Sequence, residues 1–363
     1  MNKETIAVAM SGGVDSSVTA YLLKQQGYIV IGFTMQLIDF STITGIKELG
    51  KCCSEQSIYD ARRAASIINI PHYVINLQNE FQEKVIQPFI TNYCSGKTPS
   101  PCILCNYFIK FDALLKKALA IGAQKLATGH YVKLSFNKNN NRWLLQKSVD
   151  LSKDQSYFLF NLNQYQLSKA IFPLGEYTKK EVRKIAKSIN LPVANKPESQ
   201  QLCFIPDNNY RNFIQMHHTL QNNEGTFIST NGKILGKHKG IHSYTIGQRR
   251  HLGIALGKPL YVIKINPKNN TITLGEKKDI YSLEFIAENM NWIAFDTPPC
   301  SFKAAARIRY KHEEVPATIT PIDQKNAHII FDQPQPAITP GQAVVLYQND
   351  TVIAGGWIQK VLK

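Results

Sequence analysis

Acidic side chains are scarce and long apolar runs are missing in this chain of 363 residues. Its 26 aspartates and glutamates stand against 42 lysines and arginines, so the formal net charge is +16. This imbalance indicates either a polyanionic partner such as nucleic acid or a lysine-rich solvated surface, and charge alone favours neither. Because no apolar run is long enough to cross a bilayer, we expect neither a membrane-spanning helix nor a membrane partner.

The first five residues are mostly polar and lead straight into a predicted core strand, without the pattern of a signal peptide. We therefore expect a cytoplasmic protein. Only seven cysteines are present, and in a cytosolic protein they indicate reactive or metal-binding thiols rather than a disulfide framework. The chain is long enough for two or three domains with a large core.

The most informative segment is a small-residue loop, Met10–Ser17. It follows the apolar run Ile6–Ala9, which predicts a buried strand, and precedes a predicted helix that ends at Gly27. Strand, loop and helix in this order bind phosphate, because backbone N–H groups at a helix N-terminus face the anion and glycine lets the backbone approach it. The alternative is a serine-rich turn that only caps the helix, and the order of the elements favours phosphate binding over it.

This loop lacks the lysine of a Walker loop, which reaches the β- and γ-phosphates. Asp15 stands in the loop instead. The sequence SGGVDSS resembles the pyrophosphatase loop of the N-type ATP pyrophosphatases, which cleave ATP to AMP and pyrophosphate. That resemblance implies adenylation of a substrate oxygen rather than transfer of the γ-phosphoryl group.

Residues 1–205 alternate strand-like and helix-like segments, which predicts a doubly wound, Rossmann-like parallel α/β sheet with ligands at the C-terminal ends of its strands. Predicted strands cover 6–9, 28–33, 72–77 and 125–129, and predicted helices cover 54–69, 80–94, 106–121 and 179–190, the last opened by a capping box at Thr178–Glu181. Residues 206–280 predict a helix over 210–217 and then a small β-rich central domain. Residues 281–363 predict a C-terminal β-barrel, because short alternating runs are separated by turn signals.

Three cysteines stand out from the others. Cys102 and Cys105 lie in a proline-stiffened loop that enters a predicted helix, and Cys203 lies near the end of the α/β domain. A thiol at a helix N-terminus has a lowered pKa, and the thiolate is the nucleophile. The Cys-x-x-Cys pair resembles half of a zinc site, but no second pair follows at the usual spacing. Cys94 and Cys300 fit better as small buried hydrophobic residues.

Taken together, these motifs resemble the tRNA-specific 2-thiouridylases, which place sulfur on C2 of the wobble uridine of bacterial tRNAs. The similarity runs essentially end to end, through residues 11–17, 100–106, 127–131, 153–158, 198–204, 244–249, 309–310 and 339–342. It implies a sulfurtransferase that carries out ATP-dependent 2-thiolation of uridine 34 through an adenylated intermediate and a cysteine persulfide, releasing AMP and pyrophosphate. It also implies that residues 206–280 bind tRNA.

The resemblance assigns roles to matching positions. Cys105 matches the catalytic nucleophile, and Cys203 matches the cysteine that receives sulfur as a persulfide from an upstream sulfur-carrier protein. The implied ATP site, with Mg²⁺, consists of Ala9, Met10, Ser11, Gly12, Gly13, Val14, Asp15, Ser16, Met35 and Gly129. The implied tRNA contacts are Ser100, Pro101 and Cys102 at the target base, with His130, Lys153, Asp154, Gln155, Arg309, Tyr310 and Gln342 elsewhere. The implied substrates are glutamate, glutamine and lysine tRNAs.

One departure from the family leaves the thiol chemistry open. The family often has Asn-Pro-Asp where this chain has Ser100–Cys102, so an acid/base aspartate is missing. Cys102 instead forms a set of three thiols with Cys105 and Cys203, and related thiolation enzymes hold an iron–sulfur cluster on three such cysteines. A cluster on these three residues is therefore an alternative hypothesis. In either case, Cys105 attacks the persulfide, leaving a Cys105–Cys203 disulfide, or attacks C2 directly, and the sequence does not choose.

Several assigned residues also have plain structural explanations. Arg309–Tyr310, expected on a strand, is also typical of a cross-strand pair on a solvated sheet face, and His130 is typical of a satisfied structural histidine. The basic residues of the helix after Thr178 fit either a solvated face or a track for the tRNA backbone: Lys179, Lys180, Arg183, Lys184 and Lys187.

Two other classes of function compete. Another pyrophosphatase-loop enzyme, such as a tRNA lysidine synthetase, an NAD synthetase or an argininosuccinate synthase, uses an amine or ammonia and needs no reactive cysteine. The pair Cys105 and Cys203 argues against it. A non-catalytic RNA-binding protein with a relic loop is the other class, and the intact Asp15 and the retained thiols argue against that.

Overall fold

The computed structural model describes residues 3–38, 55–197, 202–205, 209–217, 224–254 and 257–362. The chain forms two compact units. The first unit comprises Met1–Ile86, Pro101–Asn209 and Asp350–Val352, and the second comprises Gln87–Ser100, Tyr210–Asn349 and Ile353–Lys363. The units therefore do not follow chain order, because a short segment from the N-terminal half belongs with the C-terminal half.

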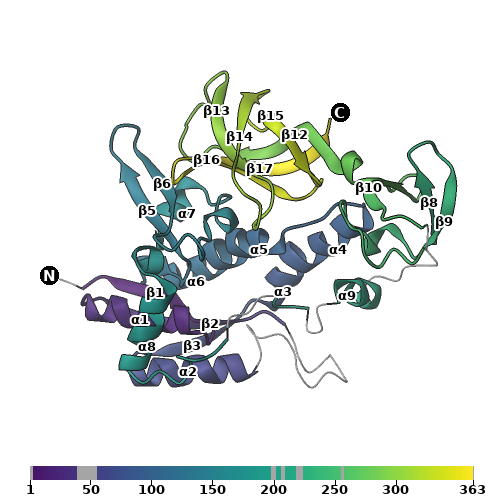
Figure 1. The fold of residues 1–363 in the computed structure, drawn as a ribbon. Coiled ribbons are helices and arrows are strands. Elements are labelled where there is room, and N and C mark those ends of the chain that lie inside the picture. Colours follow the sequence, from purple (N-terminus) through teal and green to yellow (C-terminus); the bar gives the residue numbers. More distant parts are fainter. Residues whose placement is uncertain are drawn as a thin grey trace. The chain divides into compact units, whose positions relative to one another are not determined.

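A parallel sheet organises the first unit (Figure 1). Its order is β3-β2-β1-β4-β7, and every neighbouring pair is parallel. The strands are β1 (Thr5–Ala9), β2 (Ile29–Gln36), β3 (His72–Asn76), β4 (Lys125–Ala127) and β7 (Ala170–Ile171). The chain builds outward from β1 through β2 to β3 and then returns to β4 on the other side of β1. The C-terminal ends of β1 and β4 therefore flank a topological switch point, where open α/β sheets bind ligands. The predicted doubly wound fold is confirmed.

Helices connect these strands. They are α1 (Val14–Gln25), α2 (Glu55–Ile68), α3 (Gln78–Phe81), α5 (Pro101–Leu104), α6 (Leu115–Ala120), α7 (Gln164–Ser168) and α8 (Lys179–Ser188), with π-helical segments η2 (Gln82–Ile86) and η3 (Cys105–Leu114) and short 3₁₀ turns η4 (Ser156–Phe158) and η5 (Pro173–Glu176). The capping box that opens α8 is confirmed, since the Thr178 side chain accepts from the Glu181 N–H and Glu181 accepts in return from the N–H of Thr178. A hairpin of β5 (Val132–Asn137) and β6 (Arg142–Lys147) lies between β4 and η4.

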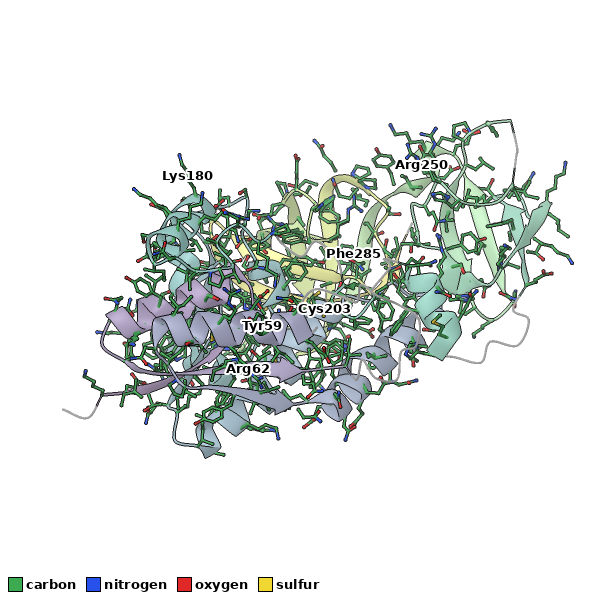
Figure 2. The ribbon with its side chains drawn as sticks, turned by 90° about the horizontal axis from the view of Figure 1, so that it is seen from below. Tyr59, Arg62, Lys180, Cys203, Arg250 and Phe285 are labelled. Carbon is green, nitrogen blue, oxygen red and sulfur yellow. The ribbon has the colours of Figure 1, made fainter. Side chains whose placement is uncertain are left out.

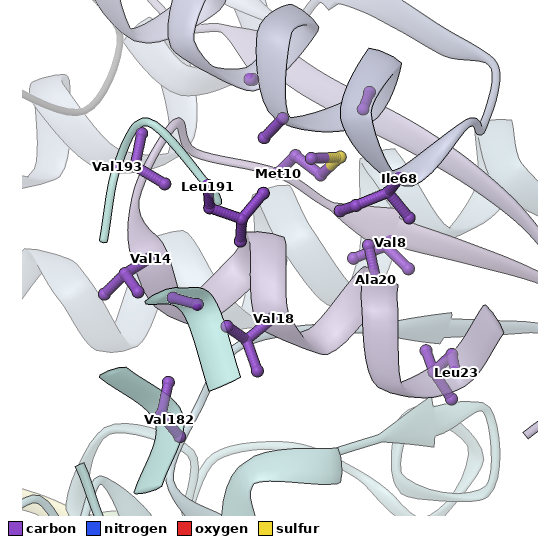
Figure 3. Packing of buried hydrophobic residues seen from close by; sticks show 14 of the residues in the cluster. Val8, Met10, Val14, Val18, Ala20, Leu23, Ile68, Val182, Leu191 and Val193 are labelled. Carbon is purple, nitrogen blue, oxygen red and sulfur yellow. The ribbon is translucent and has the colours of Figure 1, made fainter. Parts of the chain in front are cut away.

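One hydrophobic core packs α1, α2 and α8 around β1 (Figure 3). Val8 of β1, Val18 of α1 and Val182 of α8 are all fully buried in it. The loop after α8 adds Leu191 and Val193. This core fixes the first turn of α1, and with it the small-residue loop, against the sheet.

Two predicted helices differ from those observed. The helix expected from residue 106 begins at Pro101, because proline is well tolerated at a first helical position, where its missing N–H would be unpaired anyway. It continues without a break to Ala120, with η3 in its middle. The helix expected over 80–94 is divided into α3, η2 and α4 (Gln87–Cys94), and its last part belongs to the second unit.

The second unit begins with α4, which packs on α9 (Tyr210–His217). Tyr93 stacks on Tyr210 with ring centroids 4.6 Å apart, and Phe89 meets Phe213 edge to face. The helix predicted at 210–217 is confirmed. A small sheet follows in the order β10-β11-β8-β9, formed by β8 (Gly225–Ser229), β9 (Ile234–His238), β10 (Tyr261–Asn266) and β11 (Thr271–Gly275), with 3₁₀ turn η6 (Ile241–Ser243).

The rest of the second unit is a β-barrel (Figure 1). Its strands are β12 (Tyr281–Asn291), β13 (Phe302–Arg307), β14 (Val315–Pro321), β15 (Ala327–Pro336), β16 (Ala343–Gln348) and β17 (Thr351–Val361), preceded by 3₁₀ turn η7 (Lys277–Ile280). The order β12-β15-β14-β13-β16-β17 is closed into a ring by pairing of β12 with β17. The start of β17 also pairs with β6, so the β5–β6 hairpin extends the same sheet. Phe285, Ile329 and Leu346 fill the fully buried interior of the barrel. The predicted C-terminal barrel is confirmed.

None of the helices in the described part of the chain is long and apolar enough to cross a membrane.

Candidate active site

The small-residue loop connects β1 to α1 and is held by its own serines. The Ser11 N–H donates to Ser16 Oγ at 3.1 Å, and Ser17 Oγ donates to the Gly13 carbonyl at 2.9 Å. Gly12 has a φ of +68°, and a Cβ there would collide with the carbonyl oxygen of Ser57. Only glycine fits this position, so the loop presents its backbone N–H groups in one shape.

The end of β4 closes the loop from the other side of the switch point. A Cβ on Gly129 would lie 2.8 Å from the nitrogen of Ser16 and 2.9 Å from the carbonyl carbon of Asp15. Such distances are shorter than van der Waals contact, so glycine is required here for close approach. The structure therefore brings together Gly129 and the loop, which are far apart in sequence. Ala9 ends β1, and Met35 lies half-buried next to the last residue of β2.

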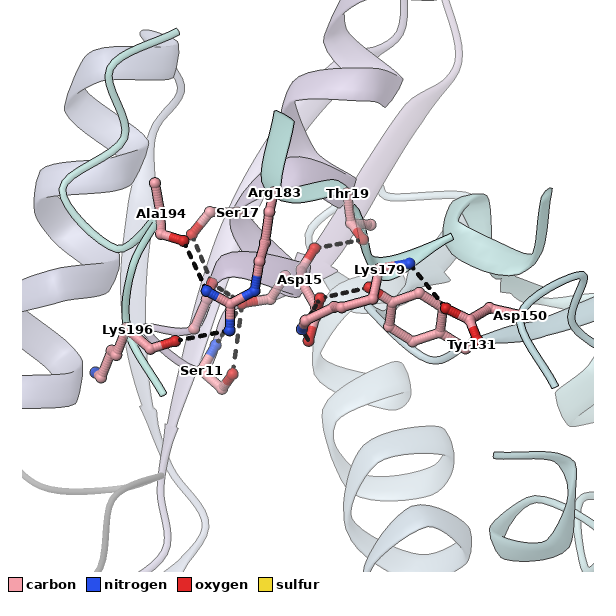
Figure 4. A network of polar contacts seen from close by, with 12 residues as sticks. Ser11, Asp15, Ser17, Thr19, Tyr131, Asp150, Lys179, Arg183, Ala194 and Lys196 are labelled. Atoms are coloured by element: carbon pink, nitrogen blue, oxygen red, sulfur yellow. Dashed lines mark hydrogen bonds and ion pairs between the residues drawn. The ribbon is translucent and has the colours of Figure 1, made fainter. Parts of the chain in front are cut away.

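The carboxylate of Asp15 is clamped by two side chains (Figure 4). Lys179 Nζ, from the first residue of α8, lies 2.7 Å from both carboxylate oxygens. The Tyr131 hydroxyl donates to Asp15 Oδ1, also at 2.7 Å. Lys179 is 8% exposed, so the ammonium of this ion pair is shielded from water, and the charged hydrogen bonds are short.

A second lysine anchors the back of the loop. Lys196 Nζ donates to the Gly12 carbonyl at 2.9 Å and pairs with Asp60 of α2 at 2.7 Å. Arg183 of α8 donates to the carbonyls of Ala194 and Lys196 and so fixes the segment that carries this lysine.

The basic helix is therefore not simply a solvated face. Lys179 points to the loop and Arg183 to the segment that carries Lys196. The other basic residues of the helix are exposed: Lys180, Lys184 and Lys187. Figure 2 shows Lys180 pointing outward.

His130 is buried at the end of β4. Its Nδ1 lies 2.7 Å from Thr128 Oγ1, and its Nε2 lies 3.4 Å from Lys110 Nζ. Burial, together with the charge of Lys110, holds the pKa of His130 well below the ordinary value of 6.5. An ammonium can only donate, so Nε2 accepts and the imidazole is neutral. Both ring nitrogens have partners inside the protein in this structure, and the expected tRNA contact of His130 stays a prediction.

The segment Lys153–Gln155 also faces inward. Asp154 is 3% exposed and accepts from the hydroxyl and the N–H of Ser156. Gln155 accepts from the Tyr131 N–H at 3.0 Å and donates its own N–H to the Tyr131 carbonyl at 3.1 Å. Asp154 is therefore an interior residue in this structure, and Gln155 positions the tyrosine that clamps Asp15. The expected tRNA contacts of Lys153, Asp154 and Gln155 stay predictions.

The two thiol-bearing segments pack on one element. Cys105 is the first residue of η3, within a helix rather than on the predicted loop, and its neighbour Asn106 is tied to the Phe158 carbonyl at 3.0 Å. Next to Cys203, Phe204 is buried against Phe81, the last residue of α3, with ring centroids 5.7 Å apart. Because α3 also packs on η3, the structure places both segments in the same region. Both thiols are half-buried, and Cys102 is exposed.

Contrary to the expectation from sequence, Cys300 is exposed rather than buried, whereas Cys94 is half-buried and burial raises its pKa. Residues 198–201 of the motif before Cys203 lie outside the described residues.

In the second unit, the predicted Thr339–Gln342 motif holds the segment that leads to Ser100. Gln342 Nε2 donates to the Thr98 carbonyl at 3.0 Å, and the Thr98 N–H donates to the Pro340 carbonyl at 2.9 Å. Gln342 therefore positions the segment to which the resemblance assigns the target base.

Comparison with known proteins identifies the family. Residues 4–207 match the family described as tRNA methyl transferase HUP domain, residues 211–276 match its PRC-barrel domain, and residues 282–358 match an aminomethyltransferase β-barrel domain. The chain is 51% identical to the tRNA-specific 2-thiouridylase MnmA of Clostridioides difficile, over 100% of this chain and 99% of that protein. It is 47% identical to the protein of the same name from Carboxydothermus hydrogenoformans, with the same coverage. The chain belongs to the tRNA-specific 2-thiouridylase family.

Within this thiouridylase fold, Arg309 and Tyr310 are not on a strand as predicted. β13 ends at Arg307, and the two residues form the turn that follows it, both half-buried. Arg309 Nη1 donates to the Pro336 carbonyl at 3.2 Å. The pairing of β13 with β16 ends at Arg307 and Val345, so the strand is over before Arg309 is reached. Arg249 and Arg250 of the central region are exposed, as Figure 2 shows for Arg250.

The iron–sulfur hypothesis is not supported by this thiouridylase structure. Among the described residues, which include Cys102, Cys105 and Cys203, no three histidines, cysteines, aspartates or glutamates gather into a group that could hold a metal ion. Cys102 is exposed in the first turn of α5, whereas Cys105 is half-buried at the start of η3. The three thiols therefore do not form a ligand set.

Sequence reasoning missed four residues that shape the loop: Asp60, Tyr131, Lys179 and Lys196. One signal was available for Lys179, because it shares the helical stripe of Val182 and Ala186, the buried face of α8. A lysine in line with two apolar core residues indicates an inward-facing charge with a partner. No comparable local signal marks the partner, since Asp15 lies 164 residues away.

Proposed function

We propose that this protein transfers sulfur to C2 of uridine 34 in tRNA, using ATP and releasing AMP and pyrophosphate. The observation that carries the proposal is the phosphate loop at the β1/β4 switch point, in a chain that keeps both family cysteines, Cys105 and Cys203, on segments packed against α3. Loop and thiols supply the two halves of the reaction: activation of an oxygen and delivery of sulfur.

Activation is needed because the C2 oxygen of uracil is a poor leaving group. Its attack on the α-phosphorus of ATP forms an O–P bond, breaks the bond to the bridging oxygen and releases pyrophosphate. Backbone N–H groups of Gly12–Ser16 stabilise the charge that develops on the phosphate oxygens. Mg²⁺ uses one or two carboxylates together with substrate phosphates. Asp15, the carboxylate of the loop, fits that role, and the ion would supply further charge neutralisation.

Sulfur delivery uses a persulfide on Cys203, formed by an upstream sulfur-carrier protein. On one route, the Cys105 thiolate attacks the inner sulfur, breaks the S–S bond and releases sulfide, which displaces AMP at C2. A Cys105–Cys203 disulfide remains, and a dithiol reductant must restore it. On the other route, Cys105 attacks C2 directly and displaces AMP, and the outer sulfur of the persulfide then attacks C2 and displaces Cys105. The freed Cys105 thiolate attacks the Cys203 sulfur and breaks the S–S bond, which leaves the sulfur on C2 and the same Cys105–Cys203 disulfide for the reductant to restore. Both routes require both thiols.

The wobble base must leave the anticodon stack to enter the site. We propose that Ser100, Pro101 and Cys102 meet it, and that Lys153, Arg309 and Tyr310 contact the surrounding RNA. Lys153 and the two barrel-turn residues are each half-buried, so part of each side chain is accessible. The substrates we propose are glutamate, glutamine and lysine tRNAs. We also propose that the protein acts in the cytoplasm, where these tRNAs are modified.

The test is a reconstituted assay with purified protein, unmodified glutamate tRNA, Mg-ATP and a persulfide donor, followed by mass spectrometry of the digested tRNA. We expect one oxygen of the wobble uridine to be replaced by sulfur. An added methyl group, or an amine in place of the oxygen, would identify a different transferase. No change in the tRNA and no AMP would favour an RNA-binding protein without catalysis.

A further inference from the structure

The phosphate loop has no lysine of its own, yet the structure places one beside it. Lys179 comes from α8, and its Nζ lies 2.7 Å from both oxygens of Asp15, one residue before Ser16 in the loop. In a Walker loop the lysine that touches the β- and γ-phosphates is part of the loop sequence. Here the lysine beside the loop, Lys179, lies 164 residues further along the chain than Asp15.

We propose that Lys179 binds the β- and γ-phosphates of ATP, replacing the missing lysine of the loop, and that Asp15 holds it in place when no nucleotide is bound. The inference rests on the proposed use of ATP and adds to it a residue that recognises the pyrophosphate leaving group. In this account the Lys179–Asp15 pair is exchanged, wholly or in part, for a Lys179–phosphate pair when the nucleotide arrives.

The position of Lys179 is built before any ligand binds. Its backbone N–H donates to Asp150 Oδ2 at 2.9 Å, and the Thr178–Glu181 capping box fixes the turn around it. Its ammonium lies 5.7 Å from the ring centre of Tyr131. A long side chain that is already ordered loses little further conformational entropy on binding. More of the energy of its contact with phosphate therefore contributes to affinity.

Charge and burial favour this exchange. The side chain of Lys179 is 10% exposed and that of Asp15 is 30% exposed, so Asp15 can turn toward solvent or a cation more easily than Lys179 can leave. A buried ammonium needs an anionic partner, and an ammonium has three donors. It can therefore keep one bond to Asp15 while it donates to phosphate.

Lys196 is the other lysine near the loop, and its contacts indicate a different task. Its Nζ is bound to the Gly12 carbonyl and to Asp60 of α2. Both partners lie on fixed backbone or on a packed helix, so Lys196 anchors the loop. Lys179 instead pairs with the carboxylate that stands in the loop itself.

The test is isothermal titration calorimetry of the full chain with ATP and with AMP. Lys179→Met should weaken ATP binding about 10- to 100-fold, because a hydrogen bond between charged groups is lost, and should leave AMP binding within twofold. Lys180→Met is the matched control, since it removes a neighbouring exposed charge from the same helix, and should bind both nucleotides as the wild type does.

Equal binding of ATP by the wild type and a folded Lys179→Met variant would overturn the inference, as would an equal loss for ATP and AMP. If Lys179→Met fails to fold, Asp15→Asn and Asp15→Asn/Lys179→Met are compared. The double variant removes the Asp15 carboxylate together with the lysine that pairs with it. The double variant should then show a lower ratio of ATP to AMP affinity than the single one, and equal ratios would refute the role. If the wild type itself binds no ATP, the proposed function is wrong. If the wild type binds ATP and the Lys179 variants bind it equally well, only the inference about Lys179 is wrong.

Discussion

Replacing Gly129 with alanine tests whether the end of β4 sets the position of the phosphate loop. The added Cβ would lie 2.8 Å from the Ser16 nitrogen, 2.9 Å from the Asp15 carbonyl carbon and 3.0 Å from Asp15 Cβ. Ordinary contact begins at 3.4 Å, so loop and strand must separate by about 0.6 Å. Two of these neighbours are backbone atoms, and none is the end of a flexible side chain, so a rotamer change cannot relieve the contact.

The size of the effect follows from that displacement. Overpacking of this kind costs about 1–3 kcal/mol of unfolding free energy. A reacting group displaced by about 1 Å loses about 100-fold in rate, so a shift near half that distance should lower the rate of tRNA-dependent pyrophosphate release about tenfold. Urea unfolding measures the first effect, and a coupled pyrophosphate assay measures the second.

Gly13→Ala is the control for unfolding. Its Cβ would meet only Ser11 Oγ, at 3.5 Å, and the φ of −103° at this position suits alanine. The urea midpoint of this variant should match that of the wild type. If Gly129→Ala unfolds and releases pyrophosphate like the wild type, the close approach of β4 to the loop is refuted.

Three other outcomes follow from the same contacts. Tyr131→Phe removes the hydroxyl that donates to Asp15, so ATP affinity in calorimetry should fall about tenfold with an unchanged melting temperature, and unchanged affinity would contradict the clamp. Gln342→Ala should raise the KM for tRNA while ATP affinity stays the same, because the amide holds the Thr98 carbonyl; a loss of ATP affinity instead would show that it acts elsewhere. Burial lowers the pKa of His72 from 6.5 to about 4. As pH falls, His72 therefore binds a proton at a higher pH in the unfolded chain than in the folded one. The free energy of unfolding then decreases from pH 6.5 downward. Wild type should lose about 2 kcal/mol more than His72→Gln between pH 7.5 and 5, and parallel urea curves for the two would refute this.

The direction of the His72 effect follows from its hydrogen bonds. Thr34 Oγ1 donates to the Met10 carbonyl and so accepts from His72 Nε2 at 2.8 Å. Nδ1 is then unprotonated, and it is buried with no hydrogen-bond partner among the described residues. A second proton would have to enter at Nδ1, where none of these residues accepts it and the charge of Arg62 opposes it.

The loop and the sheet around it could be predicted from sequence because their signals are local. An apolar run, a small-residue loop and a helix follow one another over residues 6–27, and a Thr-x-x-Glu box marks α8 by itself. The start of the Cys105 helix was missed by five residues. Ser100–Pro101 is a favourable helix start, but it was interpreted as a stiff loop.

The contacts that complete the site could not be predicted because they join distant segments. Nothing near Asp15 in sequence indicates that Lys179 and Tyr131 will meet it. His130 and Asp154 matched tRNA-contact positions, yet burial decides what each side chain touches, and burial depends on packing against residues such as Lys110 and Ser156. A sequence motif therefore indicates which chemistry a segment can perform. Tertiary packing determines which side chains of the motif are accessible to a substrate.

Hydrogen bonds around the phosphate loop connect it to the segment that carries Cys105. Gln155 holds Tyr131, Tyr131 holds Asp15, and Asn106, beside Cys105, is tied to Phe158 in the same segment as Gln155. The phosphate loop and the turn that carries Cys105 are thus both tied to one stretch of chain, residues 155–158.

The most direct test of the account is to measure pyrophosphate and 2-thiouridine together in single turnovers of the wild type, Cys105→Ser and Cys203→Ser, with tRNA, Mg-ATP and a persulfide donor. The account predicts that wild type forms both products in equal amounts, and that each serine variant forms no 2-thiouridine although Cys203→Ser still releases pyrophosphate when tRNA is present. Formation of 2-thiouridine by Cys203→Ser at the wild-type rate would contradict the division of the reaction between a phosphate loop that activates the base and a thiol pair that delivers sulfur.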